Sequence, residues 1–233
     1  MNRNINRAVW SGIILLTVLM AGPARAEPVY FTGTGLGVSG LEFMAPHYFR
    51  GFAGQLLLDN GLPDASDDFY AYCVDATKPR MTVQDMATRP LSELTNNGYS
   101  VNVQADAGAR IAWLLNNYGT DEWLSTDGNY RAAALQLAIW EVLYDPYGSY
   151  DITGGTFKLL HASLNPPLVS YTNSYFAGLG DRRSEAIWYD VNDPFGKGQD
   201  YGQPIPNPEP GTMILFGSGL VGLARIARRR ARH

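Results

Sequence analysis

The chain has 233 residues, a formal net charge of −4 and one cysteine, Cys73. A single thiol excludes an intrachain disulfide, and an acidic balance argues against nucleic acid as a partner, because phosphate binding needs a basic face. We expect no cofactor and no metal.

The amino terminus has the layout of a secretory signal. Arg3 and Arg7 precede an apolar run over 8–21, and Ala24-Arg25-Ala26 matches a small-x-small cleavage pattern. Residues 1–26 are therefore predicted to be a signal peptide, cleaved between Ala26 and Glu27. The alternative is an uncleaved anchor, but the run is short for a membrane span of ~20 residues.

The domain is expected to begin with strands. Candidate strands are 29–38, 41–43, 55–58 and 69–75. The last one alternates, so that Cys73 shares a face with Ala71 while Tyr72 faces the other way. A thiol on the inward face is a poor nucleophile, because burial raises the pKa of a thiol.

Two helices and a late strand follow. Residues 106–118 carry apolar side chains at helical spacing, and 130–144 is apolar almost all round, which predicts a central helix. Residues 186–191 alternate again. We therefore expect an α+β fold over 27–191, a β-sandwich or barrel with a helical insertion. The Gly-, Pro- and Asp-rich segment 192–207 is interpreted as a linker.

Gln136 lies inside the apolar helix, as Leu135-Gln136-Leu137-Ala138-Ile139-Trp140. A buried amide costs free energy unless it is hydrogen-bonded. Cys73 could be a small apolar core residue, and Gln136 could bond a neighbouring carbonyl. One reaction explains both residues: the sulfur attacks the amide, expels ammonia and leaves an internal thioester.

The pair resembles the internal thioester domains of Gram-positive surface adhesins. The resemblance rests on Tyr72-Cys73-Val74, on the glutamine motif above and on the order of a cysteine strand before a glutamine helix. It implies single-use covalent attachment through Cys73 and Gln136, to a protein lysine or a polysaccharide hydroxyl. Tyr72 and Trp140 are candidate pocket residues that could stabilise the oxyanion. Such a protein is not an enzyme.

The carboxyl terminus has the layout of a second targeting signal. Pro208-Glu209-Pro210 precedes a short apolar run and a cluster of arginines. Residues 208–233 resemble the PEP-CTERM sorting signal of Gram-negative bacteria. The resemblance implies recognition by an exosortase at the inner membrane, transient membrane contact through 211–227, and a final place on the cell surface or in an extracellular, biofilm-type matrix.

Two other classes of function stay open. A non-reactive structural or carbohydrate-binding surface protein would use aromatic side chains to stack on sugars; the candidates are Trp113, Tyr118, Trp123 and Tyr130. A cysteine hydrolase would need a histidine beside Cys73, and the domain offers His47 and His161. A calcium loop at Asp64, Asp67 and Asp68 is disfavoured, because the spacing is not that of an EF-hand.

Overall fold

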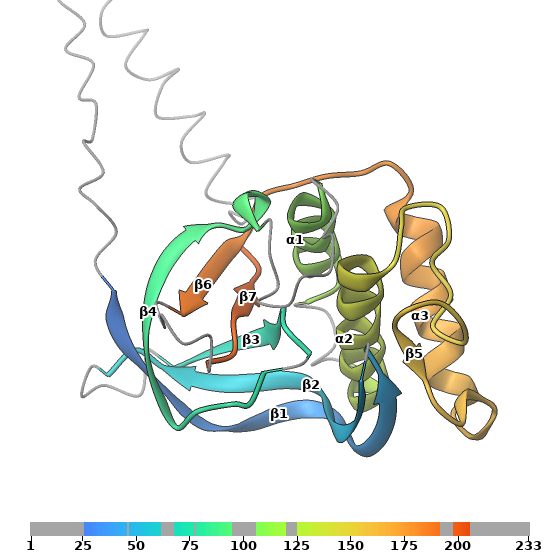
Figure 1. Cartoon of the computed structure of the whole chain (residues 1–233), viewed down its shortest axis with the longest axis horizontal. Coiled ribbons are helices and arrows are strands. Elements are labelled where there is room, and N and C mark those ends of the chain that lie inside the picture. The colour runs from blue at the N-terminus through green and yellow to red at the C-terminus, as the bar shows by residue number, and fades with distance from the viewer. Residues whose placement is uncertain are drawn as a thin grey trace, which may run out of the picture.

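The strands of the domain form one antiparallel sheet that closes on itself (Figure 1). The computed structural model describes residues 26–45, 47–61, 68–76, 78–94, 106–119, 125–191 and 198–205. Within these ranges the strands are β1 (Glu27–Met44), β2 (Tyr48–Asp59), β3 (Phe69–Cys73), β4 (Val83–Pro90), β5 (Lys158–Leu159), β6 (Ile187–Val191) and β7 (Tyr201–Gln203). The order is β2-β3-β7-β6-β4-β1-β5, and β1 also pairs with β2, so the sheet is a barrel to which β5 adds a short edge.

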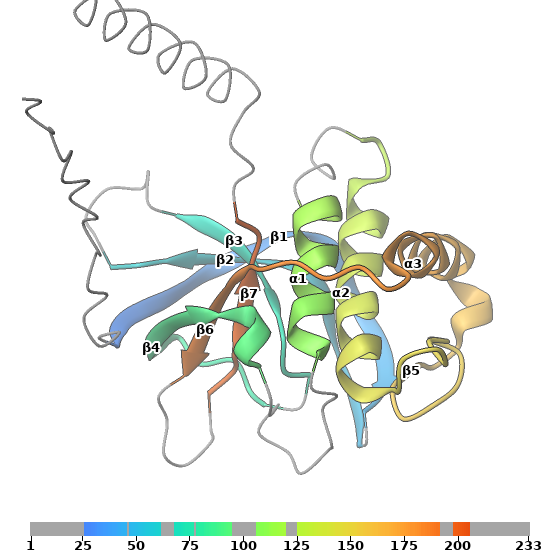
Figure 2. The same ribbon diagram turned by 90° about the horizontal axis from the view of Figure 1, so that it is seen from above.

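The helices are inserted between β4 and β6 and pack against one side of the barrel (Figure 2). They are α1 (Ala107–Tyr118), α2 (Gly128–Tyr144) and α3 (Pro166–Leu179), with short 3-10 turns at η2 (Leu91–Glu93) and η4 (Ala162–Leu164). Helix α2 contacts β1, β2, α1 and α3. Every α2 residue from Ala132 to Tyr144 is buried, which is why its sequence is apolar on all sides.

The expected sheet with a helical insertion is confirmed, and the sheet is of the barrel type. The two strands expected at 29–38 and 41–43 are a single strand, β1. Its pairing with β2 shifts register three times between Phe31 and Leu41. These irregularities fall in a run rich in glycine, where a strand bends most easily, and the bends hid its continuity in the sequence.

The sequence interpretation missed β4, β5 and α3. Helix α3 opens with Pro166 and Pro167 and continues through Ser, Thr, Asn and Tyr residues, which favour helices only weakly. Packing against α2 stabilises it instead. Thr172, for example, is fully buried and donates a hydrogen bond to the carbonyl of Ala134 in α2 at 3.3 Å.

The prediction of a linker over 192–207 is wrong for the part that the structure describes, 198–205. There β7 lies between β3 and β6, and Tyr201 is fully buried. The Asp200 carbonyl accepts a hydrogen bond from the Val74 amide, at 3.0 Å. Gly, Pro and Asp dominate the composition, and three strand residues are too few to show an alternating pattern.

Both predicted targeting segments lie outside the described residues, apart from Ala26, which directly precedes β1. This holds for the signal peptide and for the sorting signal at 208–233. Among the residues that are described, no helix combines the length and the apolar character that a membrane crossing requires.

Removal of β7 should open the barrel. A chain of residues 27–191 loses the buried Tyr201 side chain and both ladders that β7 makes, so we expect its free energy of unfolding to fall by at least about 3 kcal/mol relative to residues 27–207. Thermal or urea unfolding of the two chains measures the difference. Equal stability would show that the barrel closes without β7.

Candidate functional site

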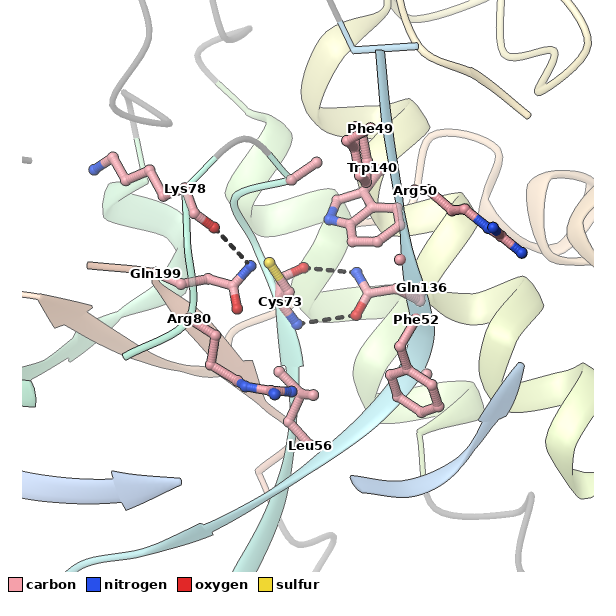
Figure 3. A pocket seen from close by; sticks show the side chains of 13 residues that line it. Phe49, Arg50, Phe52, Leu56, Cys73, Lys78, Arg80, Gln136, Trp140 and Gln199 are labelled. Carbon is pink, nitrogen blue, oxygen red and sulfur yellow. Dashed lines mark hydrogen bonds between the residues drawn. The ribbon is translucent and has the colours of Figure 1, made fainter. Parts of the chain in front are cut away.

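The structure brings Cys73 and Gln136 together. The Cys73 backbone N–H donates to Gln136 Oε1 at 3.0 Å, and Gln136 Nε2 donates to the Cys73 carbonyl at 2.7 Å (Figure 3). Cys73 is the last residue of β3 and Gln136 lies in the middle of α2. Both residues are buried, with exposed fractions of 3% and 1%. The Gln136 amide is thus buried, as the sequence predicts, and one residue, Cys73, supplies the hydrogen-bond partners that it needs.

The two hydrogen bonds take the place of a missing strand ladder. β2 pairs with β3 through Leu56 and Ala71, and two further steps in the same register would set Gly54 opposite Cys73. The ladder between β2 and β3 ends at Leu56 and Ala71, so Gly54 is paired only on its other side, with Gly37 of β1. Its φ of +145° and the approach of the Leu36 carbonyl, 2.3 Å from where a Cβ would lie, require glycine. The backbone N–H and carbonyl of Cys73 on this edge of β3 therefore bond to the Gln136 amide.

Small residues let α2 reach this edge. Ala132 and Ala133 lie one turn before Gln136 and are fully buried. A larger side chain at either position would hold the helix away from its neighbours, because protein interiors are close-packed. The sequence therefore fixes the distance between the amide and the strand as much as it fixes the amide itself.

The Cys73 sulfur is held in a tight turn after β3. Sγ donates to the Asp75 carbonyl at 2.7 Å and lies 3.3 Å from the Asp75 backbone N–H. Burial raises the pKa of the Cys73 thiol well above its ordinary value, and the Asp75 carboxylate raises it further. The thiol is therefore protonated at neutral pH, so its attack on a carbonyl needs a local route for the proton.

A cavity of about 370 Å³ opens beside the pair (Figure 3). Its wall includes Cys73, Gln136 and the aromatic rings of Phe49, Phe52 and Trp140. The polar part comes from Arg50, Lys78, Arg80 and Gln199. These four residues were not identified from the sequence. They come from β2, from the turn after β3 and from the segment interpreted as a linker, so no local motif joins them.

Trp140, a candidate pocket residue from the sequence, lies in the cavity wall. The residue is 3% exposed, and its ring packs edge-on against Phe43 and Phe49. The indole is close enough to the Cys73 sulfur to lower the pKa of the thiol, although burial outweighs this effect. Even so, its Nε1–H meets no acceptor at hydrogen-bond geometry within the described residues. A buried donor without a partner is uncommon and is a candidate for a functional role.

Tyr72 is not brought to the cavity. It is buried, but it is absent from the residues that line the cavity. Tyr72 and Cys73 are successive residues of β3, and successive strand residues point to opposite faces of the sheet, so Tyr72 points away from the face of Cys73. The sequence prediction placed it near the reactive pair because it is next to Cys73 in the chain, and strand geometry separates them.

The residues of the two alternative functions lie elsewhere. His47 and His161 are exposed, and neither lines the cavity. The Trp113 ring is covered by the Arg182 guanidinium, and Tyr118 stacks on Tyr175, so these rings do not form an open stacking face.

The remaining residues of those alternatives can be placed only in part. Tyr130 is 41% exposed. Asp68 is described, whereas Trp123, Asp64 and Asp67 lie outside the described residues.

Comparison with known proteins identifies two segments. Residues 70–174 match the family model of the thioester domain, and residues 208–230 match the model of the PEP-CTERM protein-sorting motif. The first match contains both Cys73 and Gln136, and the second contains Pro208, Glu209 and Pro210. The resemblance read from the sequence is therefore confirmed for both segments.

Two solved structures are similar to the chain. One is the N-terminal thioester domain of the fibronectin-binding protein SfbI from Streptococcus pyogenes, at 11% identity and a TM-score of 0.43, covering 75% of this chain and 100% of that one. The other is the N-terminal thioester domain of a surface protein from Clostridium perfringens, at 12% identity and a TM-score of 0.41, covering 71% and 98%. A search of curated proteins gives no match.

Asp200 is a second buried acid beside the reactive pair. Its Oδ1 accepts the Val191 N–H at 3.0 Å, and burial raises the pKa of its carboxyl to about 7. Because the folded state holds this proton more tightly than the unfolded state does, stability falls as pH rises from about 4 to 7. The charge also raises the pKa of the Cys73 thiol, as a smaller effect than burial and Asp75.

Asp200→Asn should remove this pH dependence. The amide keeps the acceptor for Val191 and carries no charge, so at pH 8 we expect the variant to be more stable than the wild type by on the order of 2–4 kcal/mol. At pH 4 the two should agree. Urea unfolding at both pH values tests this, and a stability difference that does not change with pH would contradict it.

Proposed function

We propose that this chain is an exported surface protein in which Cys73 and Gln136 form an internal thioester, used once to attach the protein covalently to a partner. The observation that carries the proposal is the pair of hydrogen bonds, 3.0 and 2.7 Å long, that holds the Gln136 carboxamide against Cys73 in a buried site. The thioester-domain match over both residues supports the chemistry. The PEP-CTERM match supports export and processing by an exosortase.

Formation of the bond is an acyl transfer within the chain. Sγ of Cys73 attacks Cδ of Gln136, a C–S bond forms, and the C–N bond breaks. The thiol proton passes to the departing nitrogen, which leaves as ammonia. The Cys73 N–H already donates to Oε1, so it would stabilise the oxyanion of the tetrahedral intermediate without rearrangement. A backbone donor of this kind could not be identified from residue types.

The bond is preserved by burial until a partner arrives. A thioester carbonyl is a better electrophile than an amide, and a dry site protects it from water. A partner amine that enters the cavity attacks Cδ, the C–S bond breaks, and the proton lost by the amine restores the thiol. The product is an isopeptide between Gln136 and a lysine; a hydroxyl would give an ester instead. Each molecule reacts once, so the protein is an attachment device and not an enzyme.

Trp140 is proposed to assist this second step. Its N–H is buried in the cavity wall and makes no hydrogen bond among the described residues. The indole also lies close enough to the Cys73 sulfur to lower the pKa of the thiol, so it can donate to charge that develops at the thioester during attack.

The intact mass of the purified chain tests the thioester. We expect a mass lower than that of the processed sequence by one molecule of ammonia, and methylamine should add one molecule of itself at Gln136. Cys73→Ala and Gln136→Ala should both show the full sequence mass. A full mass for the wild type, with Cys73 open to alkylation after unfolding, would mean that the two hydrogen bonds are purely structural and that the protein belongs to the non-reactive class.

Trp140→Phe tests the donor. The ring is kept and the N–H is lost, so the reaction of the thioester with methylamine should slow by about tenfold or more. Trp188→Phe is the matched control: Trp188 is also buried, its Nε1 has no hydrogen-bond partner in the described part of the chain, and it does not line the cavity. Equal rates for the wild type and both variants would remove Trp140 from the mechanism.

A further inference from the structure

We infer that the site selects an amine carried on an acidic partner, namely a lysine side chain flanked by carboxylates. This inference rests on the proposed thioester and deepens it, because it concerns which nucleophile reaches Gln136. Among the described residues, the cavity wall carries three cationic residues, Arg50, Lys78 and Arg80, and no Asp or Glu. The chain as a whole is acidic, at −4, so this concentration of positive charge is local.

Two of these cations have no carboxylate partner among the described residues. Lys78 lies 3.6 Å from Asp75 and is neutralised by it. Arg50 donates from Nε to the Gly40 carbonyl at 3.3 Å, and Arg80 lies over the Phe31 ring, 3.7 Å from its centroid. Both contacts position the guanidinium group and leave its charge in place. In the view of Figure 3, Cys73 and Gln136 lie between Arg50 on one side and Lys78 and Arg80 on the other.

This charge acts on an incoming amine in two ways. It opposes the approach of a protonated amine, and it lowers the pKa of an amine that has entered, which favours the neutral form that can attack. A carboxylate next to the amine reverses the first effect, because arginine binds carboxylates through two parallel hydrogen bonds. Anionic amines should therefore react faster than cationic amines of the same length.

The depth of the site favours a lysine. The reacting groups belong to residues that are 3% and 1% exposed, whereas Arg50 and Arg80 are exposed. A long, unbranched side chain can carry its amine to Gln136 while carboxylates on neighbouring residues stay near the arginines. A hydroxyl fixed directly on a sugar ring has no such reach.

The test uses the thioester form of residues 27–207 and three amines with the same four-carbon chain: γ-aminobutyrate, butylamine and putrescine. Loss of the thioester is followed by mass spectrometry at low salt, with rates corrected for the neutral-amine fraction. We expect γ-aminobutyrate to react about tenfold faster than putrescine, with butylamine between them, and the spread to shrink at high salt. Peptides with one lysine flanked by Glu or by Gln should show the same order.

Arginine variants assign the effect to the cavity. In the double variant Arg50→Gln with Arg80→Gln, the ratio between γ-aminobutyrate and putrescine should fall close to one. Arg89→Gln is the matched control, because Arg89 is half exposed, pairs with Asp190 and does not line the cavity; it should keep the ratio.

The outcomes separate the two proposals. If the intact mass of the wild type is not lower by one molecule of ammonia, the proposed function is wrong. A thioester that reacts at charge-independent rates, or whose charge preference survives the double variant, overturns the inference alone. Faster ester formation with an acidic polysaccharide than isopeptide formation with the Glu-flanked peptide would overturn the choice of a lysine.

Discussion

The site depends on the contact between one side-chain amide and one backbone. Cys73 ends its strand two residues beyond the last residue that pairs with β2, which leaves a buried N–H and a buried carbonyl without a ladder partner on that side. Buried polar groups of this kind must be paired. Gln136 pairs both at once, and its own oxygen and nitrogen are satisfied in return. The constraint that stabilises the fold is thus the same one that sets a carbonyl carbon beside a cysteine.

Much of this site could be predicted from the sequence. A lone cysteine on an alternating strand and a glutamine inside an apolar helix are local patterns, and the apolar periodicity predicted both α1 and α2. The cavity wall was not predictable in the same way. Gln199 donates to the Asp75 carbonyl at 3.0 Å from a segment that has the composition of a linker. Tyr72 shows the converse error, because a neighbour in sequence points away in a strand. Long-range pairing, which no local pattern encodes, decides both cases.

The charge around the cavity differs in sign from the net charge of the chain. The chain is acidic overall, but a partner that approaches the site responds to the local charge at the cavity. Here Arg50 and Arg80 are held at the cavity by a backbone carbonyl and an aromatic ring. Neither contact neutralises the two guanidinium groups, so their positive potential acts on any group that enters the cavity. Asp75 and Asp200 are buried near the sulfur, and the negative charge of each raises the pKa of the Cys73 thiol.

The position of β7 has a mechanical consequence. β7 ends at Gln203, shortly before the segment that matches the sorting motif, and it pairs directly with the strand that ends at Cys73. A surface protein held at its carboxyl end and bonded to a partner through Gln136 would bear tension along this short route. Because β7 is flanked by β3 and β6, a pull along it loads both ladders in shear, with their hydrogen bonds sharing the force. Of the helices, α2 carries Gln136 and would take the load at the partner's end.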